Sequence, residues 1–218
     1  MDREILLIVD PMCSWCWGFS PTIGAMAEEF AGQAPIFPIV GGLRPLTEDP
    51  MTGQAKAEVR HHWADVEKAS GQSFDYSFFD RDGFIYDTEP ACRALVTVRT
   101  LKQPEAALGF LAAQHRAFYA ENRDITDAAV LAELAETAGV DRDAFLAAFP
   151  TRKLIYLTAT DFFRSQSMGV TGFPTVVLRS EGNLSLLTAG FQPFAALKPQ
   201  LENWIAGGVD AEKEPAKA

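Results

Sequence analysis

The feature that most constrains this chain is a pair of cysteines, Cys13 and Cys16, placed shortly after an apolar segment. That segment, residues 5–9, is rich in β-branched side chains and matches a strand buried on both faces. Helical signals predict a helix over residues 13–30, and a second apolar run predicts a strand over residues 35–40. Strand, helix and strand in this order predict a βαβ unit with parallel strands and a right-handed crossover.

The remainder of the chain divides into a helical stretch and a return to strands. Apolar residues at helical spacing dominate residues 45–166. Residues 175–178 and 184–189 predict two strands joined by a hairpin turn, and residues 194–205 predict a closing helix. The order therefore predicts a small α/β domain into which a large all-helical segment is inserted.

This order predicts a domain assembled from two separated segments. We expect its first part over residues 1–43, the helical insertion over 44–166, its second part over 167–208 and a flexible tail over 209–218.

The two cysteines have the spacing of a redox-active dithiol. Cys13 is expected at the mouth of the helix, where free N–H groups and the positive end of the helix dipole stabilise a thiolate. Cys16 lies one turn further in, so we expect it to be more buried and less ionised. Cys13 is then the attacking nucleophile and Cys16 the thiol that resolves the mixed disulfide. The alternative is half of a structural zinc site, but only Cys92 and three histidines remain as ligands, so we expect no metal.

Composition narrows the classes of partner. The chain has 218 residues and a formal net charge of −10, which argues against binding to nucleic acid or to anionic lipid. No stretch approaches the length of a membrane span, and the apolar run at residues 5–9 is too short for a secretory signal. These features predict a cytoplasmic protein.

A second segment, Gly172-Phe173-Pro174-Thr175, begins a predicted buried strand. Proline is tolerated at the entry of a strand because its missing N–H is not needed there. A cis Phe173–Pro174 bond would instead leave backbone groups free beside the cysteines to pair with a bound chain. Most X–Pro bonds are trans, so these residues alone favour the first interpretation.

In combination, these motifs resemble a known family. Residues 10–18 (DPMCSWCWG), the helical insertion and residues 172–175 (GFPT) are similar to the DsbA-type thioredoxin-fold proteins, most of all to their cytoplasmic FrnE-like branch. The resemblance covers residues 4–206. It implies the α/β class with a thioredoxin-like fold, a four-stranded mixed sheet and a large all-helical insertion. It also implies that Cys13 is the nucleophile, that Cys16 resolves, and that Pro174 is a cis-proline.

The same resemblance implies a function. It is that of a thiol–disulfide oxidoreductase or isomerase acting on disulfide- or thiol-containing proteins or small molecules. No bound cofactor is expected, and a thiol such as glutathione is a candidate partner. We expect substrate contacts at Ser14, Trp15, Phe173 and Pro174. Ser14-Trp15 replaces the Pro-His pair of the periplasmic DsbA enzymes, whose histidine helps to stabilise the thiolate, so we expect a weaker oxidant. The sequence does not specify the oligomeric state.

Several other residues have structural interpretations. Trp17 is predicted to pack in the core, whereas Trp15 is predicted to form an apolar rim. Cys92 and His115 are interpreted as buried core residues. His61 and His62 are predicted to lie at the surface of the insertion. The loop after the second strand is expected at the edge of the site, and substrate contact by Arg44 of this loop is a hypothesis.

Two alternative functions stay open at this point. Glutathione-dependent enzymes of the kappa-transferase and 2-hydroxychromene-2-carboxylate isomerase type resemble this chain in having a helical insertion, but they typically use a serine and lack the paired cysteine. Some cytoplasmic relatives are adaptors that deliver a partner protein to a protease. Fold alone does not separate these alternatives from exchange chemistry.

Overall fold

The computed structural model describes residues 3–207, and its centre is a four-stranded mixed sheet. The strand order is β2-β1-β3-β4, where β1 pairs parallel with β2 and antiparallel with β3. This confirms the predicted fold class. The strands are β1 (Arg3–Val9), β2 (Ile36–Val40), β3 (Thr175–Ser180) and β4 (Asn183–Ala189).

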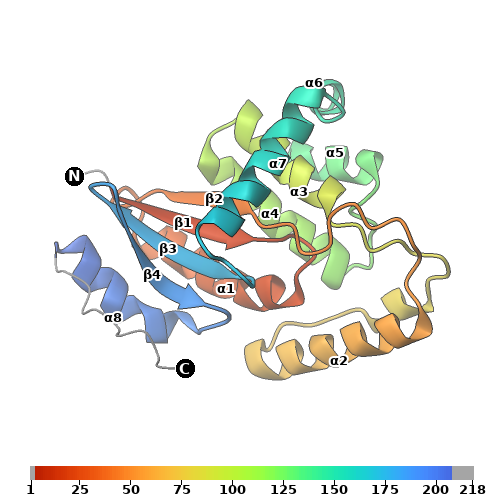
Figure 1. Ribbon diagram of the computed structural model, residues 1–218, viewed down its shortest axis with the longest axis horizontal. Coiled ribbons are helices and arrows are strands. Elements are labelled where there is room, and N and C mark those ends of the chain that lie inside the picture. Colours follow the sequence, from red (N-terminus) through yellow and green to blue (C-terminus); the bar gives the residue numbers. More distant parts are fainter. Residues whose placement is uncertain (1–2, 208–218) are drawn as a thin grey trace.

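Alternate residues of β1 face two separate apolar clusters because successive side chains of a strand point to opposite faces. Ile5, Leu7 and Val9 belong to the main core together with side chains of α1 (Ser14–Glu29) and α8 (Phe194–Ile205). Leu6 and Ile8 belong to a smaller cluster on the other face. Figure 1 shows α8 beside the β4 end of the sheet and most helices of the inserted stretch at its β2 end, whereas the helix over residues 53–70 lies apart from the sheet. Both faces of β1 are therefore buried, as its apolar sequence predicts.

The predicted helical stretch contains six α-helices and one 3₁₀ helix among the described residues. Side-chain oxygens at five of the seven N-caps accept free backbone N–H groups of the first turn, as N-cap residues commonly do. The elements are α2 (Gly53–Ser70), η1 (Tyr76–Asp80), α3 (Glu89–Leu101), α4 (Pro104–Tyr119), α5 (Ala128–Thr137), α6 (Arg142–Ala148) and α7 (Arg152–Ser167).

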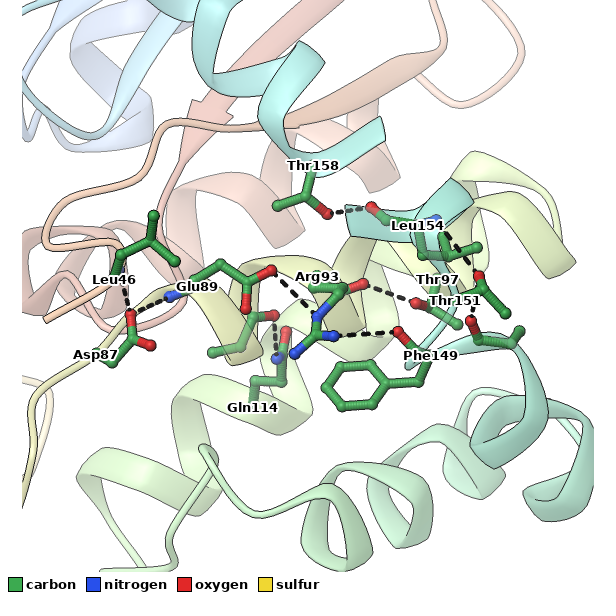
Figure 2. Close-up of polar contacts among 12 residues, drawn as sticks. Leu46, Asp87, Glu89, Arg93, Thr97, Gln114, Phe149, Thr151, Leu154 and Thr158 are labelled. Atoms are coloured by element: carbon green, nitrogen blue, oxygen red, sulfur yellow. Dashed lines mark hydrogen bonds and ion pairs between the residues drawn. The ribbon is translucent and has the colours of Figure 1, made fainter. Parts of the chain in front are cut away.

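A chain of polar contacts ties the loop after β2 to the helical block (Figure 2). Asp87 Oδ1 accepts the backbone N–H groups of Leu46, at 2.7 Å, and Glu89, at 3.0 Å. Glu89 pairs with Arg93 at 3.1 Å, and the guanidinium of Arg93 lies 4.2 Å from the centre of the Phe149 ring. The position of this loop relative to α3 and α6 is thus held by charged side chains.

The predicted domain boundaries stay a prediction, and residues 208–218, which contain the predicted tail, lie outside the described residues. All but the last residue of α7 falls within the predicted insertion, yet the helix contacts the sheet directly, since Asp161 Oδ2 accepts the N–H of Val40 in β2 at 3.1 Å. Within residues 3–207, no helix is both long enough and apolar enough to cross a lipid bilayer.

Candidate active site

Cys13 occupies the N-cap position of α1, as its sequence position predicts. Its backbone is extended, and its carbonyl accepts the N–H groups of Cys16, at 2.9 Å, and Trp17, at 3.1 Å. The N–H of Cys13 in turn donates to the carbonyl of Asp10 at 3.0 Å. The thiol group is therefore held where the first N–H groups of the helix and the positive end of its dipole favour negative charge.

The two thiols differ in their access to solvent. Both cysteines are free; Cys13 retains 6% of its surface exposed and lines a pocket, whereas Cys16 is fully buried and does not line it. Burial, followed by the neighbouring Cys13, raises the pKa of the Cys16 thiol well above its usual range. The predicted order of burial, with Cys16 deeper than Cys13, is confirmed.

The segment before β3 lies directly against Cys13. The Phe173–Pro174 bond is cis, which confirms the expectation drawn from the resemblance. Cys13 Sγ donates a weak hydrogen bond to the carbonyl oxygen of Phe173 at 3.5 Å. The Phe173 ring leaves no room for a side chain at Gly41, where an added Cβ would lie 1.9 Å from a ring carbon. The loop after β2 and the cis-prolyl loop therefore fit together only with glycine at this position.

A buried carboxylate, whose role no sequence motif indicated, lies beneath the dithiol. Asp10 is fully buried and accepts the N–H groups of Met12, at 2.9 Å, and Leu43, at 2.6 Å. The thiol of Cys92, itself fully buried as predicted, approaches Asp10 Oδ2 at 3.4 Å. Burial raises the pKa of Asp10, and these hydrogen bonds oppose the rise. The available signals are its place directly after β1 and its position at the start of the DPMCSWCWG segment. Asp10 joins the Cys13 loop to the loop after β2.

Trp17 packs in the core, as predicted, and its backbone carbonyl accepts a hydrogen bond from a side chain of the insertion. Pro21 lies inside α1 and has no N–H to donate to the carbonyl of Trp17 four residues earlier. Gln72 Nε2 donates to that carbonyl instead, at 3.2 Å, while Trp17 Nε1 donates to the carbonyl of Ser73, at 3.2 Å. The residues after α2 thereby satisfy the polar groups of the helix that carries the dithiol.

The pocket beside Cys13 has a volume of about 230 Å³ and combines five segments of the chain. Trp15 is half-buried on its wall, with its ring 6.0 Å from that of Phe191, so the predicted apolar rim is present. His62 is exposed, as predicted, and it also lines the pocket, which no sequence pattern indicates. The lining residues are Met12, Cys13, Ser14, Trp15, Leu43, Arg44, Val59, His62, Trp63, Tyr86 and Phe173. Pro174 is buried next to Phe173.

His115 is a fully buried core residue, as predicted, and it lies beside the helix of the dithiol. Its Nδ1 atom is 2.9 Å from Ser20 Oγ, which also donates to the carbonyl of Cys16 at 3.3 Å. Burial lowers the pKa of His115 to about 3, because the charged form loses its hydration. The ring is therefore neutral at physiological pH and acts here as a packing and hydrogen-bonding group.

This neutral histidine predicts a pH-dependent stability. The pKa of His115 rises from about 3 in the folded chain to 6.5 on unfolding. The unfolded state thus binds the extra proton as the pH falls below 6.5, and stability falls with it. We expect His115 to lower the free energy of unfolding by about 1.4 kcal/mol for each pH unit by which the pH falls between these two values. Urea unfolding measures this effect. Between pH 7 and pH 5, the free energy of unfolding should fall less for His115→Gln than for wild type, and equal decreases would contradict a neutral, buried His115.

The alternative of a metal site concerns the same two cysteines. Within residues 3–207, no three His, Cys, Asp or Glu side chains converge in a way that could hold a metal ion. That the protein works without a metal stays a prediction.

A cysteine thiol at a helix start, in contact with a cis-prolyl loop that leads into a mixed sheet, is the arrangement of thioredoxin-fold proteins. The family model of the DSBA-like thioredoxin domain matches residues 4–202, so the chain belongs to this family.

Solved structures agree with this assignment, and one curated relative is similar over most of the chain. A crystal structure of a "putative protein disulfide isomerase" from Nitrosomonas europaea is 35% identical, with a TM-score of 0.88, and covers 95% of this chain and 99% of that chain. The cytosolic disulfide reductase DsbM from Pseudomonas aeruginosa is 26% identical, with a TM-score of 0.78, over 94% of this chain and 100% of that chain. The ClpXP adapter protein SpxH from Shouchella clausii is 25% identical over 97% of this chain and 70% of the relative.

Proposed function

We propose that this protein catalyses thiol–disulfide exchange through Cys13 and Cys16. One observation carries the proposal: at the start of α1, Cys13 opens into a pocket while Cys16 lies buried one turn below it. This arrangement gives one sulfur access to a substrate and keeps the second sulfur for an internal reaction. Family membership and the similarity to a disulfide reductase support the same chemistry.

The reaction has two steps. The Cys13 thiolate attacks one sulfur of a substrate disulfide, forms a mixed disulfide and releases the first substrate thiolate, which takes up a proton. Cys16 then loses its proton and attacks the Cys13 sulfur, which releases the second substrate thiol and leaves a Cys13–Cys16 disulfide. The substrate is reduced by two electrons and the protein dithiol is oxidised. The same steps in reverse oxidise a substrate dithiol or, when interrupted, isomerise a disulfide.

The substrate contacts in this proposal are made by residues around the Cys13 thiol. Ser14 and Trp15 line one side of the pocket, and Phe173 lines it from the other, with Pro174 behind it. The carbonyl of Phe173 accepts a hydrogen bond from the Cys13 thiol. Once that thiol has formed a mixed disulfide, the carbonyl is available to the N–H of a bound peptide.

Glutathione is the thiol partner that we propose, with no bound cofactor. A DsbM structure with GSH is 26% identical to this chain, with a TM-score of 0.74, and covers 93% of this chain. Because DsbM is described as cytosolic, we place the protein in the cytoplasm, in line with the FrnE-like branch. Disulfide-containing proteins and small disulfides are the proposed substrates.

The proposal is tested by equilibrating the protein in glutathione buffers of graded ratio. We expect a reversible two-electron transition, followed by the fluorescence of Trp15 and Trp17 and confirmed by alkylation of the two thiols. The oxidised fraction at each ratio gives the reduction potential, and we expect a less oxidising value than that of the periplasmic DsbA enzymes. A dithiol that stays reduced at every ratio, together with no insulin reduction above background, would refute the proposal.

A second candidate function is that of an adaptor, which the SpxH relatives favour. The exposed Tyr156 and Phe163 of α7, each 71% exposed, are aromatic side chains of the kind that anchor protein interfaces. Under this alternative, binding of a partner protein is unchanged when both Cys13 and Cys16 are replaced by serine, whereas exchange activity is lost.

A further inference from the structure

Arg44 is a positively charged residue in a pocket beside Cys13, and no acidic residue of the described chain lines this pocket. The ionisable residues of the lining are Cys13, Arg44, His62 and Tyr86, and no Asp or Glu contributes. Within residues 3–207, no carboxylate lies within ion-pair distance of Arg44 or of His62. The chain as a whole has 29 acidic and 19 basic residues, so acidic partners are abundant elsewhere.

The backbone of Arg44 is held rigidly. Its N–H donates to Thr88 Oγ1 at 3.1 Å, and its carbonyl accepts the N–H of Thr88 at 3.2 Å and the hydroxyl of Thr47 at 3.0 Å. The preceding N–H, of Leu43, donates to Asp10. The contacts of Asp87 in Figure 2 fix the same loop two residues further on. A ligand that binds the guanidinium therefore meets a pre-organised loop.

The side chain of Arg44 lies over the ring of Tyr86, in the same pocket as the nucleophile. The guanidinium carbon lies 5.3 Å from the centre of the Tyr86 ring, and the Tyr86 hydroxyl donates to the carbonyl of Met12 at 2.7 Å. Met12 is the residue before Cys13. Tyr86 thus contacts both the cation and the backbone next to the reactive thiol. The carboxylate beneath this loop, that of Asp10, is fully buried and already accepts two backbone N–H groups, so it does not neutralise the pocket.

We propose that Arg44 forms an anion subsite beside Cys13, which binds the carboxylate of a small acidic thiol or disulfide while its sulfur reacts. This inference rests on the exchange chemistry proposed above and specifies its substrate class. An arginine fork matches a carboxylate with two parallel hydrogen bonds, and such charge-assisted bonds are the strong ones. A pocket of about 230 Å³ is small and suits a short thiol peptide rather than a folded chain. His62 adds a second donor at the mouth.

The subsite is tested with two disulfide reagents of similar shape and different charge. Reduced protein reacts stoichiometrically with 5,5′-dithiobis(2-nitrobenzoate), which carries two carboxylates, or with 4,4′-dithiodipyridine, which is neutral. The rate constant at Cys13 is measured by stopped flow for wild type, Arg44→Met and Arg44→Lys. Arg60→Met is the matched control, because Arg60 also lies over aromatic rings, those of Tyr76 and Phe79, but does not line the pocket.

We expect Arg44→Met to slow the reaction with the dianionic reagent about tenfold and to leave the neutral reaction within about twofold. Arg44→Lys should retain only part of the preference, because it keeps the charge but not the two parallel hydrogen bonds of the guanidinium. Arg60→Met should change neither rate. Raising the salt concentration should weaken the preference in wild type and not in Arg44→Met. Equal losses with both reagents, or no loss with either, would overturn the subsite.

The two proposals fail separately in this design. The attack of Cys13 on the reagent is the first step and precedes resolution by Cys16, so its rate constant does not depend on turnover. Charge selectivity without insulin reduction or a glutathione equilibrium would refute exchange catalysis and keep the subsite. Turnover without charge selectivity would refute the subsite alone. Turnover with glutathione disulfide should then show the same Arg44 dependence in KM, whereas the neutral 2-hydroxyethyl disulfide should not.

Discussion

Replacing Cys13 with serine will abolish thiol–disulfide exchange, whereas replacing Cys16 with serine will leave a protein that attacks a disulfide once and then stops. The difference follows from the geometry at the start of α1. Only Cys13 lines the pocket, so a serine there leaves no sulfur that a substrate can reach. Without Cys16, the mixed disulfide on Cys13 has no internal thiol to resolve it. We expect insulin reduction to fall to background in both variants, with a trapped covalent adduct in Cys16→Ser only.

Mass spectrometry after exposure to glutathione disulfide identifies that adduct, and its position on Cys13 is established by peptide mapping. The matched control is Cys92→Ala. Cys92 is fully buried, and burial raises the pKa of its thiol well above the usual range, so this variant should retain turnover. Turnover by Cys13→Ser, or an adduct on Cys92 in wild type, would mean that the nucleophile has been assigned to the wrong sulfur.

The local elements of this fold follow from the sequence because they depend on short-range signals. The closing helix predicted over residues 194–205 is α8 (Phe194–Ile205). The helix predicted over 13–30, after the first strand, is α1 (Ser14–Glu29), with Cys13 as its N-cap. Apolar periodicity and the positions of glycine set these boundaries. The cis Phe173–Pro174 bond is different, because its residues alone favour trans and only the resemblance predicts it.

The parts of the site that the sequence does not show come from contacts between distant segments. Asp10 and Leu43 are joined by a hydrogen bond across 33 positions, and Tyr86 and Met12 by one across 74. The periodicity of a sequence does not determine which loops contact one another. The sequence therefore predicts that His62 lies at the surface, but not that it lines the pocket. For the same reason, the sequence gives substrate contact by Arg44 only as a hypothesis. That Arg44 has no carboxylate partner within residues 3–207 follows only from the structure, which shows its neighbours.

A buried ion pair that joins three elements illustrates the same point. Asp161 in α7 binds Arg99 of α3 through two parallel contacts, 2.8 Å and 3.1 Å long, and its Oδ2 atom also accepts the N–H of Val40. The Arg99 and Asp161 side chains are only 12% and 8% exposed. Arg99 also donates to the carbonyl of Pro38 and lies 4.7 Å from the centre of the Phe37 ring. The pair thus connects α7, α3 and the end of β2 next to the glycine loop of the site.

Asp161→Ala is therefore expected to lower the free energy of unfolding by about 3–5 kcal/mol, because it leaves the Arg99 guanidinium buried without its counter-charge and the Val40 N–H without its acceptor. Chemical denaturation at neutral pH measures this loss. The control is Glu121→Ala, which removes a pair with Arg116 whose side chains are 39% and 73% exposed, and should cost less than about 1 kcal/mol. Adding Arg99→Met to Asp161→Ala removes the unpaired charge, so the double variant should be more stable than Asp161→Ala alone. A double variant that is less stable would show that Arg99 contributes mainly through Pro38 and Phe37.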